Sequence, residues 1–372
     1  MMKAVVLQEP GRLTVERVPV PEIAPREILL EVGACAMCGS DLEAYLGIHP
    51  SVKEYPIVLG HEFAGTVVAA GPRVTRYKVG DRICHTGGRV CGTCEACQRG
   101  DYRNCPQRRG AGFAADGAYA EYVALLGDDF YSHPLPDNLS MAQGALAQPF
   151  GIGYHAATAR AQAREGQTIV VQGCGPIGLS AMMAAKLSGA TLVSTDVLDY
   201  RLKLARRLGA DHTLNVERED AVAFTLELTG GRGVDTVIEC VGGDQDGTLP
   251  QACEMLRRGG RLVVVGSFAR DAATVRIIKF KFGEMEMFGS QGFPEGYGSL
   301  LELISSGRVD VRPMMTHRVG LDGVPEAMEM LREKRDGVVK VVIEPRDRRR
   351  IPARTISTFH PTPNATGSLP RR

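Results

Sequence analysis

Four cysteines lie within fifteen residues of this 372-residue chain, and their spacing is the strongest constraint on how it folds locally. Two residues separate each of the first three cysteines and seven separate the last two, at Cys91, Cys94, Cys97 and Cys105. Thiolates are soft ligands, and Zn²⁺ accepts four of them in a closed tetrahedral site. The polar, loop-like neighbours disfavour a buried apolar cluster or a disulfide pair. The spacing therefore predicts a structural zinc in a lobe over 91–105.

The charge of the chain is unevenly divided, which excludes some functions. The formal net charge is +1, but residues 345–372 hold seven Arg and one Asp, which leaves about −5 on the rest. Such a body has no basic stripe to attract nucleic acid. No apolar run approaches the ~20 residues of a membrane span, and the first residues resemble a strand, not a secretory leader. The other cysteines show no disulfide pattern, so we expect a cytoplasmic protein.

Two kinds of hydrophobic pattern divide the chain. Up to about residue 150, short strand signals alternate with Gly and Pro residues. From about Gln167, strands alternate with helices, which predicts a parallel sheet. The expected strands there are Thr168–Gln172, Thr191–Thr195, Val234–Cys240 and Arg261–Val265. The expected helices between them are Ile177–Ser188, Arg201–Leu208 and Gln251–Arg258.

This change of pattern predicts an α/β protein with an inserted domain. We expect a first domain over 1–150, a doubly wound α/β domain over 151–290, and a return to the first domain over 291–345. The tail over 346–372 has no hydrophobic periodicity. It is either a disordered terminus or an arm for nucleic acid or membrane, and we expect disorder.

A glycine-rich run predicts a dinucleotide site. Gly173-Cys-Gly175-Pro176-Ile177-Gly178 follows a predicted strand and opens a predicted helix, whose free N–H groups favour phosphate. Asp196 ends the next strand, where a carboxylate bonds ribose hydroxyls and repels a 2′-phosphate, so NAD is favoured over NADP. The alternative is a plain glycine turn with Asp196 as a surface acid. Arg201 lies either against the adenine or in solvent.

Two further motifs become informative in combination. They are Cys38-Gly-Ser40-Asp41 and Gly60-His61-Glu62, and they precede the four-cysteine lobe, the glycine-rich run and the acidic strand end. In this order, over residues 1–345, the chain resembles the zinc-containing medium-chain alcohol and polyol dehydrogenases, and within them the sorbitol, butanediol and threonine dehydrogenase-like enzymes. The resemblance implies a Rossmann domain inserted in a mainly-β GroES-like catalytic domain. It also implies a small-molecule substrate and a homodimer or homotetramer.

The resemblance implies a second, catalytic zinc in each subunit. Cys38 and His61 match its ligands, and Glu62 matches either a third ligand or a near neighbour of the metal. Such a zinc keeps one position open. Asp41 matches an acid that holds the liganding imidazole, and its alternative role is a charge at a helix N-terminus.

Ser40 matches the hydroxyl that takes the substrate proton, and its alternative role is an N-cap, because Ser40 and Glu43 also form a capping-box pattern. Two positions depart from the family. Glu43 replaces a proton-relay histidine, and Gln148 replaces an acid before proline, so we expect Gln148 to bond water or substrate. The other histidines show no metal spacing. We expect His155 to pack within a helix. We expect surface or loop positions for the rest, which are His49, His85, His133, His212, His317 and His360.

The predicted function follows from these roles. We expect a zinc-dependent oxidoreductase that transfers a hydride between NAD and a secondary alcohol, diol, polyol or sugar derivative. The resemblance implies that zinc acts as a Lewis acid on the substrate hydroxyl while the cofactor accepts the hydride. The alternatives are an aldehyde or threonine-type dehydrogenase of the same fold, and a non-catalytic cofactor-binding protein.

Overall fold

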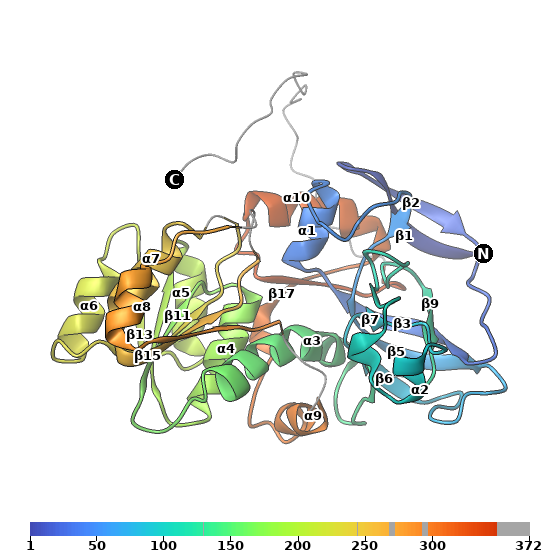
Figure 1. Cartoon of the computed structure of the whole chain (residues 1–372). Coiled ribbons are helices and arrows are strands. Elements are labelled where there is room, and N and C mark those ends of the chain that lie inside the picture. The colour runs from blue at the N-terminus through green and yellow to red at the C-terminus, as the bar shows by residue number, and fades with distance from the viewer. Residues whose placement is uncertain (129, 244, 268–271, 292–296, 348–372) are drawn as a thin grey trace, which may run out of the picture.

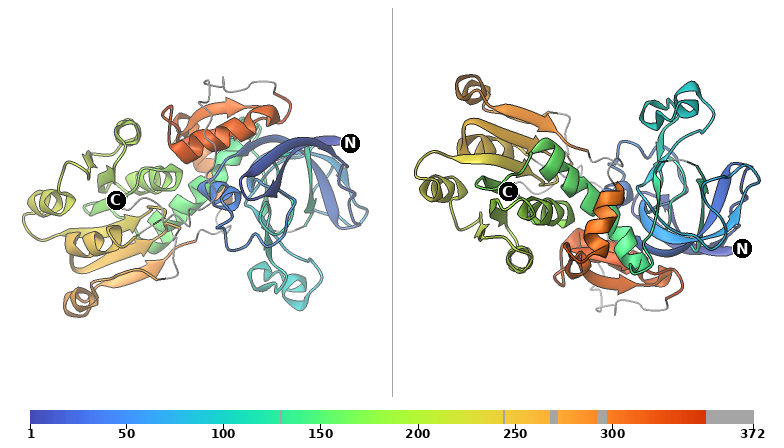
Figure 2. Two further views of the ribbon diagram at one scale, coloured as in Figure 1. Left: turned by 90° about the horizontal axis from the view of Figure 1, so that it is seen from above. Right: turned by 90° about the horizontal axis from the view of Figure 1, so that it is seen from below.

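The computed structural model describes residues 1–128, 130–243, 245–267, 272–291 and 297–347. Two bodies built on β-sheets lie side by side, and helix α3 (Met141–His155) runs between them in every view (Figures 1 and 2). The segment that holds the short helix α2 (Glu95–Gln98) projects away from the first body (Figure 2). Within the described residues, no helix combines the length and apolar character that a membrane crossing requires.

The first body is mainly β. Its larger sheet, counted over the described residues, has seven strands: β10 (Ser132–Pro134), β6 (Arg82–His85), β5 (Glu62–Ala70), β3 (Glu27–Ala36), β18 (Lys340–Ile343), β17 (Met315–Val319) and β9 (Tyr122–Leu126), which pairs with β3. Two smaller sheets contain β2 (Arg12–Val18), β1 (Met2–Glu9) and β4 (Ile57–Val58), and β7 (Gly88–Arg89) with β8 (Arg109–Gly110). Apolar residues of β1, β3 and β5 fill the core of this body.

The chain returns to this body at its end. Strand β18 pairs antiparallel with β3, with Val342 opposite Ala36, and parallel with β17. The amide of Met37 donates to the carbonyl of Val341 at 2.9 Å, which extends the pairing past the end of β3. This return brings Lys340, at the start of β18, beside the residues that follow β3.

The second body is a parallel sheet. Over the described residues its order is β13 (His212–Asn215), β12 (Thr191–Asp196), β11 (Thr168–Gln172), β14 (Val234–Glu239), β15 (Leu256–Val264) and β16 (Glu286–Gly289). Consecutive strands run outward from β11 in one direction and from β14 in the other, so the order reverses between these two. Ligands of such sheets bind at this point, outside the carboxyl ends of the strands.

Helices cover both faces of the parallel sheet. Ile169 and Val171 of β11 pack with α4 (Pro176–Lys186) and α5 (Asp199–Arg207), whereas Val170 between them packs with the helices of the opposite face. Those helices are α6 (Ala221–Leu228), α7 (Thr248–Met255) and α8 (Ile277–Gly283). Side chains that alternate along a strand fill two cores in this way. Three further helices are α1 (Gly39–Tyr45), α9 (Tyr297–Ser305) and α10 (Val324–Glu333).

Apart from the helical position expected for His155, helix α3 was not predicted, because proline and glycine inside it are typical of loops. The helix contains Pro149 and three glycines within Met141–His155. One of these, Gly153, has a packing reason, since a Cβ there would lie 2.3 Å from the amide nitrogen of Ala181 in α4. The same residues that weaken the helix signal therefore let α3 pack closely on the second body.

The bounds of one predicted helix need correction, and the predicted disorder of the tail is not tested. The helix predicted over Gln251–Arg258 ends at Met255, and Leu256 instead pairs with Val234 as the first residue of β15. Pairing with a distant strand overrides the local helical pattern here. The predicted disordered tail lies outside the described residues from 348 onward. Its first residue, Arg346, is described and bonds the carboxylate of Glu31.

Candidate functional site

Cys38 stands where β3 ends and α1 begins. It is the N-cap of α1, and its N–H donates to the carboxylate of Asp41 at 2.8 Å. An acid at the third helical position commonly reaches back to the cap in this way. The predicted capping box that starts at Ser40 is therefore wrong, because the helix begins at Gly39, before Ser40.

Asp41 connects three groups in the core of the first body. Its Oδ1 lies 3.4 Å from Nδ1 of His61, and its Oδ2 accepts the hydroxyl proton of Tyr119 at 2.8 Å. Burial alone would raise the pKa of Asp41, but His61, Cys38 and Tyr119 outweigh it and lower that pKa. The carboxylate thus lies beside Nδ1 of the imidazole, which leaves Nε2 for another partner. Both roles left open for Asp41, helix charge and support of His61, are compatible with this geometry.

Three candidate metal ligands converge next to Asp41. One ligand atom from each of Cys38, His61 and Glu62 lies within 4.8 Å of the other two. A thiolate, an imidazole and a carboxylate are all zinc ligands, and three protein ligands with one open position are typical of catalytic zinc. The donor set of these residues therefore fits zinc.

Sequence reasoning missed Lys340, which makes a buried ion pair with Glu62. Its Nζ lies 2.8 and 3.0 Å from the two carboxylate oxygens, and the side chains are 1% and 0% exposed. Burial alone would lower the pKa of Lys340, but Glu62 and Cys38 outweigh it and raise that pKa. A protonated Lys340 therefore holds the carboxylate that was predicted to lie on or near the metal.

Three predicted residues lie on helices around this group. Ser40 is partly buried in the first turn of α1. Glu43 lies one turn later, and burial raises its pKa. Gln148 is partly buried in α3, the helix between the two bodies. Their roles in proton transfer and substrate binding stay predictions.

The prediction of surface or loop positions was wrong for His133 and His85. His133 lies partly buried in strand β10 and stacks on Tyr297 with ring centroids 4.4 Å apart. His85 is the more deeply buried of the two. It is 1% exposed in strand β6, where its ring stacks on Phe63 with centroids 4.8 Å apart. Its Nδ1 accepts the N–H of Gly87 at 3.0 Å, and burial lowers its pKa to about 3. His85 is therefore a neutral core residue, while His360 lies outside the described residues.

The glycine-rich run lies at the predicted place, between strand β11 and helix α4. Helix α4 begins at Pro176, a favoured first helical residue. A Cβ at Gly178 would lie 1.8 Å from the carbonyl oxygen of Gly173, so only glycine fits there. Gly175 and Ile177 complete a turn whose helix N-terminus faces the reversal point of the sheet.

Asp196 and Arg201 border this turn. The Asp196 carboxylate accepts the N–H groups of Cys174 at 2.7 Å and Leu198 at 2.9 Å. Arg201 Nη1 lies 3.9 Å from that carboxylate and the same distance from where a Cβ of Gly175 would stand. With 16% exposure, the Arg201 side chain is not the solvated residue of the alternative prediction. The roles of both side chains toward a dinucleotide stay predictions.

Another acid, Glu239, ends strand β14, which borders the reversal point of the sheet. It is fully buried, and its Oε1 accepts from the N–H of Val241 and the hydroxyl of Thr248, both at 3.0 Å. Burial raises its pKa from 4.5 to about 7. The protonated carboxyl is therefore the favoured form below neutral pH.

This shift predicts a pH dependence of stability. Because the folded pKa is the higher one, the contribution of Glu239 to folding is fully present below pH 4.5 and is lost as pH rises through about 7. The loss amounts to roughly 3 kcal/mol. In Glu239→Gln, this decrease in the free energy of unfolding with rising pH should vanish. Urea unfolding of both proteins at pH 5 and pH 8 measures the difference. Parallel profiles for both proteins would contradict the assignment.

The four lobe cysteines meet around one point. Thiolates at about 2.3 Å from a tetrahedral zinc lie about 3.8 Å apart. The Cys91 sulfur lies 3.9 Å from that of Cys97 and 3.7 Å from that of Cys105, and Cys94 completes the group. N–H groups of Thr93 and Cys94 lower the pKa of Cys91 to about 6. The sulfur–sulfur distances and the lowered pKa of the Cys91 thiol both fit a structural zinc.

Cys97→Ser should open this lobe. Structural zinc contributes folding free energy directly, so losing one thiolate should release the metal and leave one zinc per chain. Proteolysis within residues 91–105 should become at least about tenfold faster. Zinc analysis and timed proteolysis measure both effects. An intact lobe with its zinc retained would show that three thiolates are enough.

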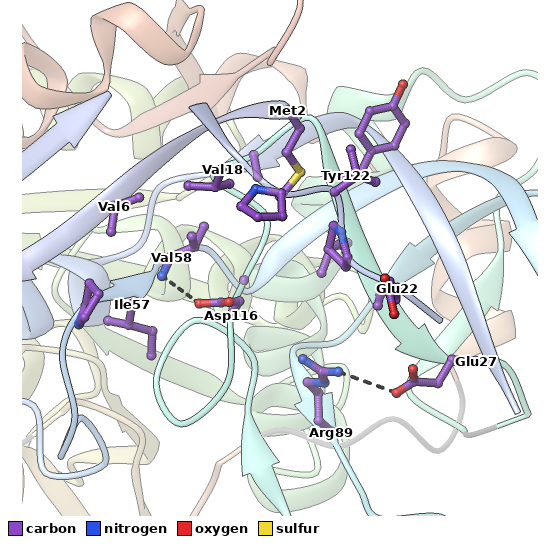
Figure 3. Close-up of a pocket in the computed structure, with 18 residues that line it drawn as sticks. Met2, Val6, Val18, Glu22, Glu27, Ile57, Val58, Arg89, Asp116 and Tyr122 are labelled. Atoms are coloured by element: carbon purple, nitrogen blue, oxygen red, sulfur yellow. Dashed lines mark hydrogen bonds and ion pairs between the residues drawn. The ribbon is translucent and has the colours of Figure 1, made fainter. Parts of the chain in front are cut away.

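A separate cavity of about 610 Å³ lies in the first body (Figure 3). Its walls include apolar residues of β1, β4 and β9 and of the segment 18–21 at the end of β2. Asp116 is bonded to the Val58 amide, and Arg89 is directed at Glu27. Among its lining residues, all of them described, there is none of the predicted site residues. The cavity is therefore distinct from the site built around Cys38.

Comparison with known proteins decides the family. Residues 24–137 match the alcohol dehydrogenase GroES-like domain, and residues 176–306 match the zinc-binding dehydrogenase model. A sorbitol dehydrogenase of Bacillus subtilis is 36% identical over 351 residues, which cover 92% of this chain and 97% of that protein. The chain belongs to the zinc-type alcohol and polyol dehydrogenases. This dehydrogenase is therefore an oxidoreductase that acts on a small molecule, and its predicted fold class is confirmed.

Solved structures agree with the fold of the dehydrogenase. An alcohol dehydrogenase from Thermus sp. ATN1 is 30% identical with a TM-score of 0.84, covering 92% of this chain and 99% of the other. A putative zinc-binding dehydrogenase from Sinorhizobium meliloti 1021, bound to NADP, is 30% identical with a TM-score of 0.83. The match covers 93% of this chain and 99% of the other. Because that relative binds NADP, membership of the family does not decide between NAD and NADP.

Proposed function

We propose that the protein oxidises a secondary alcohol, diol, polyol or sugar derivative with NAD, using a zinc held by Cys38 and His61. The convergence of Cys38, His61 and Glu62 within 4.8 Å is the observation that carries this proposal. When bound, zinc supplies a Lewis acid that lowers the pKa of the substrate hydroxyl. Glu62 adds a carboxylate to the site, either as a third ligand or as a neighbour held by Lys340.

The chain's own residues then orient the substrate and move its proton. Asp41 fixes the ring of His61, so that Nε2 keeps one direction. Ser40, in the first turn of α1, would accept the hydroxyl proton while passing its own proton on to water. The nicotinamide, when bound, would supply the hydride acceptor. Gln148, which is neutral, can donate a hydrogen bond to a substrate oxygen, whereas the acid of the related enzymes cannot.

Asp196 supports the choice of NAD. Its carboxylate is held by two backbone N–H groups at the end of β12, where it would meet the ribose of a bound dinucleotide. A 2′-phosphate at this place would lie beside a fixed negative charge. Arg201, whose guanidinium faces Asp196, would lie against the adenosine.

Asp196→Ala should therefore relax the choice of cofactor. We expect the ratio of kcat/KM with NADP to kcat/KM with NAD to rise at least about tenfold, since the variant loses the ribose bonds and the repulsion together. Initial rates with each cofactor measure it. A wild-type protein that prefers NADP, or an unchanged ratio in the variant, would contradict the role of Asp196.

We also propose two zincs per subunit, one at Cys38 and one in the 91–105 lobe. All ten cysteines are free thiols in the structure, and the thiolate ligands of zinc must stay reduced, which supports a cytoplasmic location. A homodimer or homotetramer stays a prediction, as do the domain boundaries at 150, 290 and 345.

A substrate screen tests the proposed function. Purified, zinc-saturated protein is mixed with NAD and a panel of secondary alcohols, diols and polyols, and NADH formation is followed by absorbance. We expect at least one polyol or diol to be oxidised. NADH formation from none of the panel, or only from aldehydes or threonine, would replace this proposal with one of the alternatives.

A further inference from the structure

Three aromatic rings form a row that starts at a predicted metal ligand. The ring centroid of His61 lies 4.8 Å from that of Phe113, and the ring of His49 stacks on Phe113 with centroids 4.1 Å apart and an interplanar angle of 10°. Phe113 and His49 are only partly buried, so part of each residue remains accessible. The sequence predicted a loop or surface role for His49 because its neighbours along the chain contain no ligand motif.

The backbone holds His49 in one tautomer. Its Nδ1 accepts the N–H of Ser51 at 3.2 Å, so the proton of a neutral imidazole stays on Nε2. Burial and the neighbouring His61 lower the pKa of His49, while Asp41 opposes them. The ring is therefore neutral and offers one N–H donor, Nε2.

The loop that carries His49 is tied to helix α1. The carbonyl of Glu43 accepts the N–H groups of His49 at 3.2 Å and Ile48 at 2.9 Å. Ser40 lies one turn earlier on the same helix, so the proposed proton acceptor and the imidazole donor belong to one anchored segment. Glu43 adds an acidic group to this segment, which disfavours a phosphorylated substrate over a neutral one.

We propose that His49 is a substrate-binding residue whose Nε2–H donates to a second hydroxyl of a neutral polyol, while the reacting hydroxyl lies at the Cys38–His61 site. This inference rests on the proposed function and narrows its substrate class. A monofunctional alcohol has no oxygen to accept this bond. The imidazole should therefore favour polyols over simple alcohols through binding, without taking part in hydride transfer.

His49→Phe tests the proposal, because phenylalanine keeps a ring on Phe113 and removes the donor. We measure kcat/KM with NAD for sorbitol, xylitol, sorbitol 6-phosphate and 2-butanol, and the binding of xylitol to the enzyme–NADH complex by calorimetry. His49→Gln supplies an amide donor again. His212→Phe is the matched control, since His212 packs edge-on against Phe224 in the other body.

We expect the ratio of kcat/KM for polyol to that for 2-butanol to fall about tenfold in His49→Phe, with a similar loss of xylitol affinity. His49→Gln should recover part of the ratio, and His212→Phe should leave it unchanged. Equal losses on all substrates, or an unchanged ratio, would overturn the role of His49 alone. A wild-type preference for the phosphate would overturn the substrate class. A wild type that oxidises nothing in the panel would overturn the proposed function and this inference with it.

Discussion

Cys38→Ser should lower kcat/KM for alcohol oxidation by at least about a thousandfold, because a zinc Lewis acid contributes several kcal/mol to the transition state. The zinc content should fall from two to one per chain. The fold should survive, since serine is a preferred N-cap residue and Cys38 caps α1. Metal analysis, initial rates and the melting temperature measure the three effects.

Cys253→Ser is the matched control for this change. Cys253 is fully buried in α7, in the hydrophobic cluster of the opposite body, so the same replacement of sulfur by oxygen should leave both zincs and the activity in place. If Cys38→Ser kept two zincs and wild-type rates, the catalytic metal would have to be held elsewhere.

Lys340→Met should destabilise the protein by about 3–5 kcal/mol, because it leaves the buried carboxylate of Glu62 without its partner. Methionine has a similar length and is apolar, so little packing is lost. Urea unfolding of the zinc-saturated protein gives the difference in the free energy of unfolding.

The exposed pair of Lys186 and Asp211 provides the contrast. These side chains are 41% and 36% exposed at an N–O distance of 2.8 Å, so Lys186→Met should cost less than about 1 kcal/mol. Equal, small losses in both variants would show that another group compensates the charge of Glu62.

Much of the site could be predicted because its chemistry depends on local spacing. The lobe cysteines, the glycine-rich run and Asp196 each belong to a short segment whose residue types already limit its function. The fold class followed from strands alternating with helices. For Cys38, His61 and Asp41 the residues alone were uninformative, and the order of the motifs was needed.

The missed features depend on packing between distant segments. Lys340 is 278 residues from Glu62 in sequence, and only the pairing of β18 with β3 brings them together. His49 becomes relevant through Phe113, which comes from another loop. Helix α3 contains residues that disfavour helices, and its contact with α4 explains at least Gly153. Local patterns carry no information about such contacts.

Zinc dependence of hydride transfer tests the central claim most directly. The protein is purified with two zincs. The catalytic zinc, whose coordination position stays open to small molecules, is removed by a mild chelator. NADH formation from the best polyol is measured before removal, after it, and after zinc is restored. We predict full activity at two zincs per chain, almost none at one, and recovery when the second returns. Undiminished NADH formation by protein that has lost the zinc at Cys38 and His61 would contradict the account.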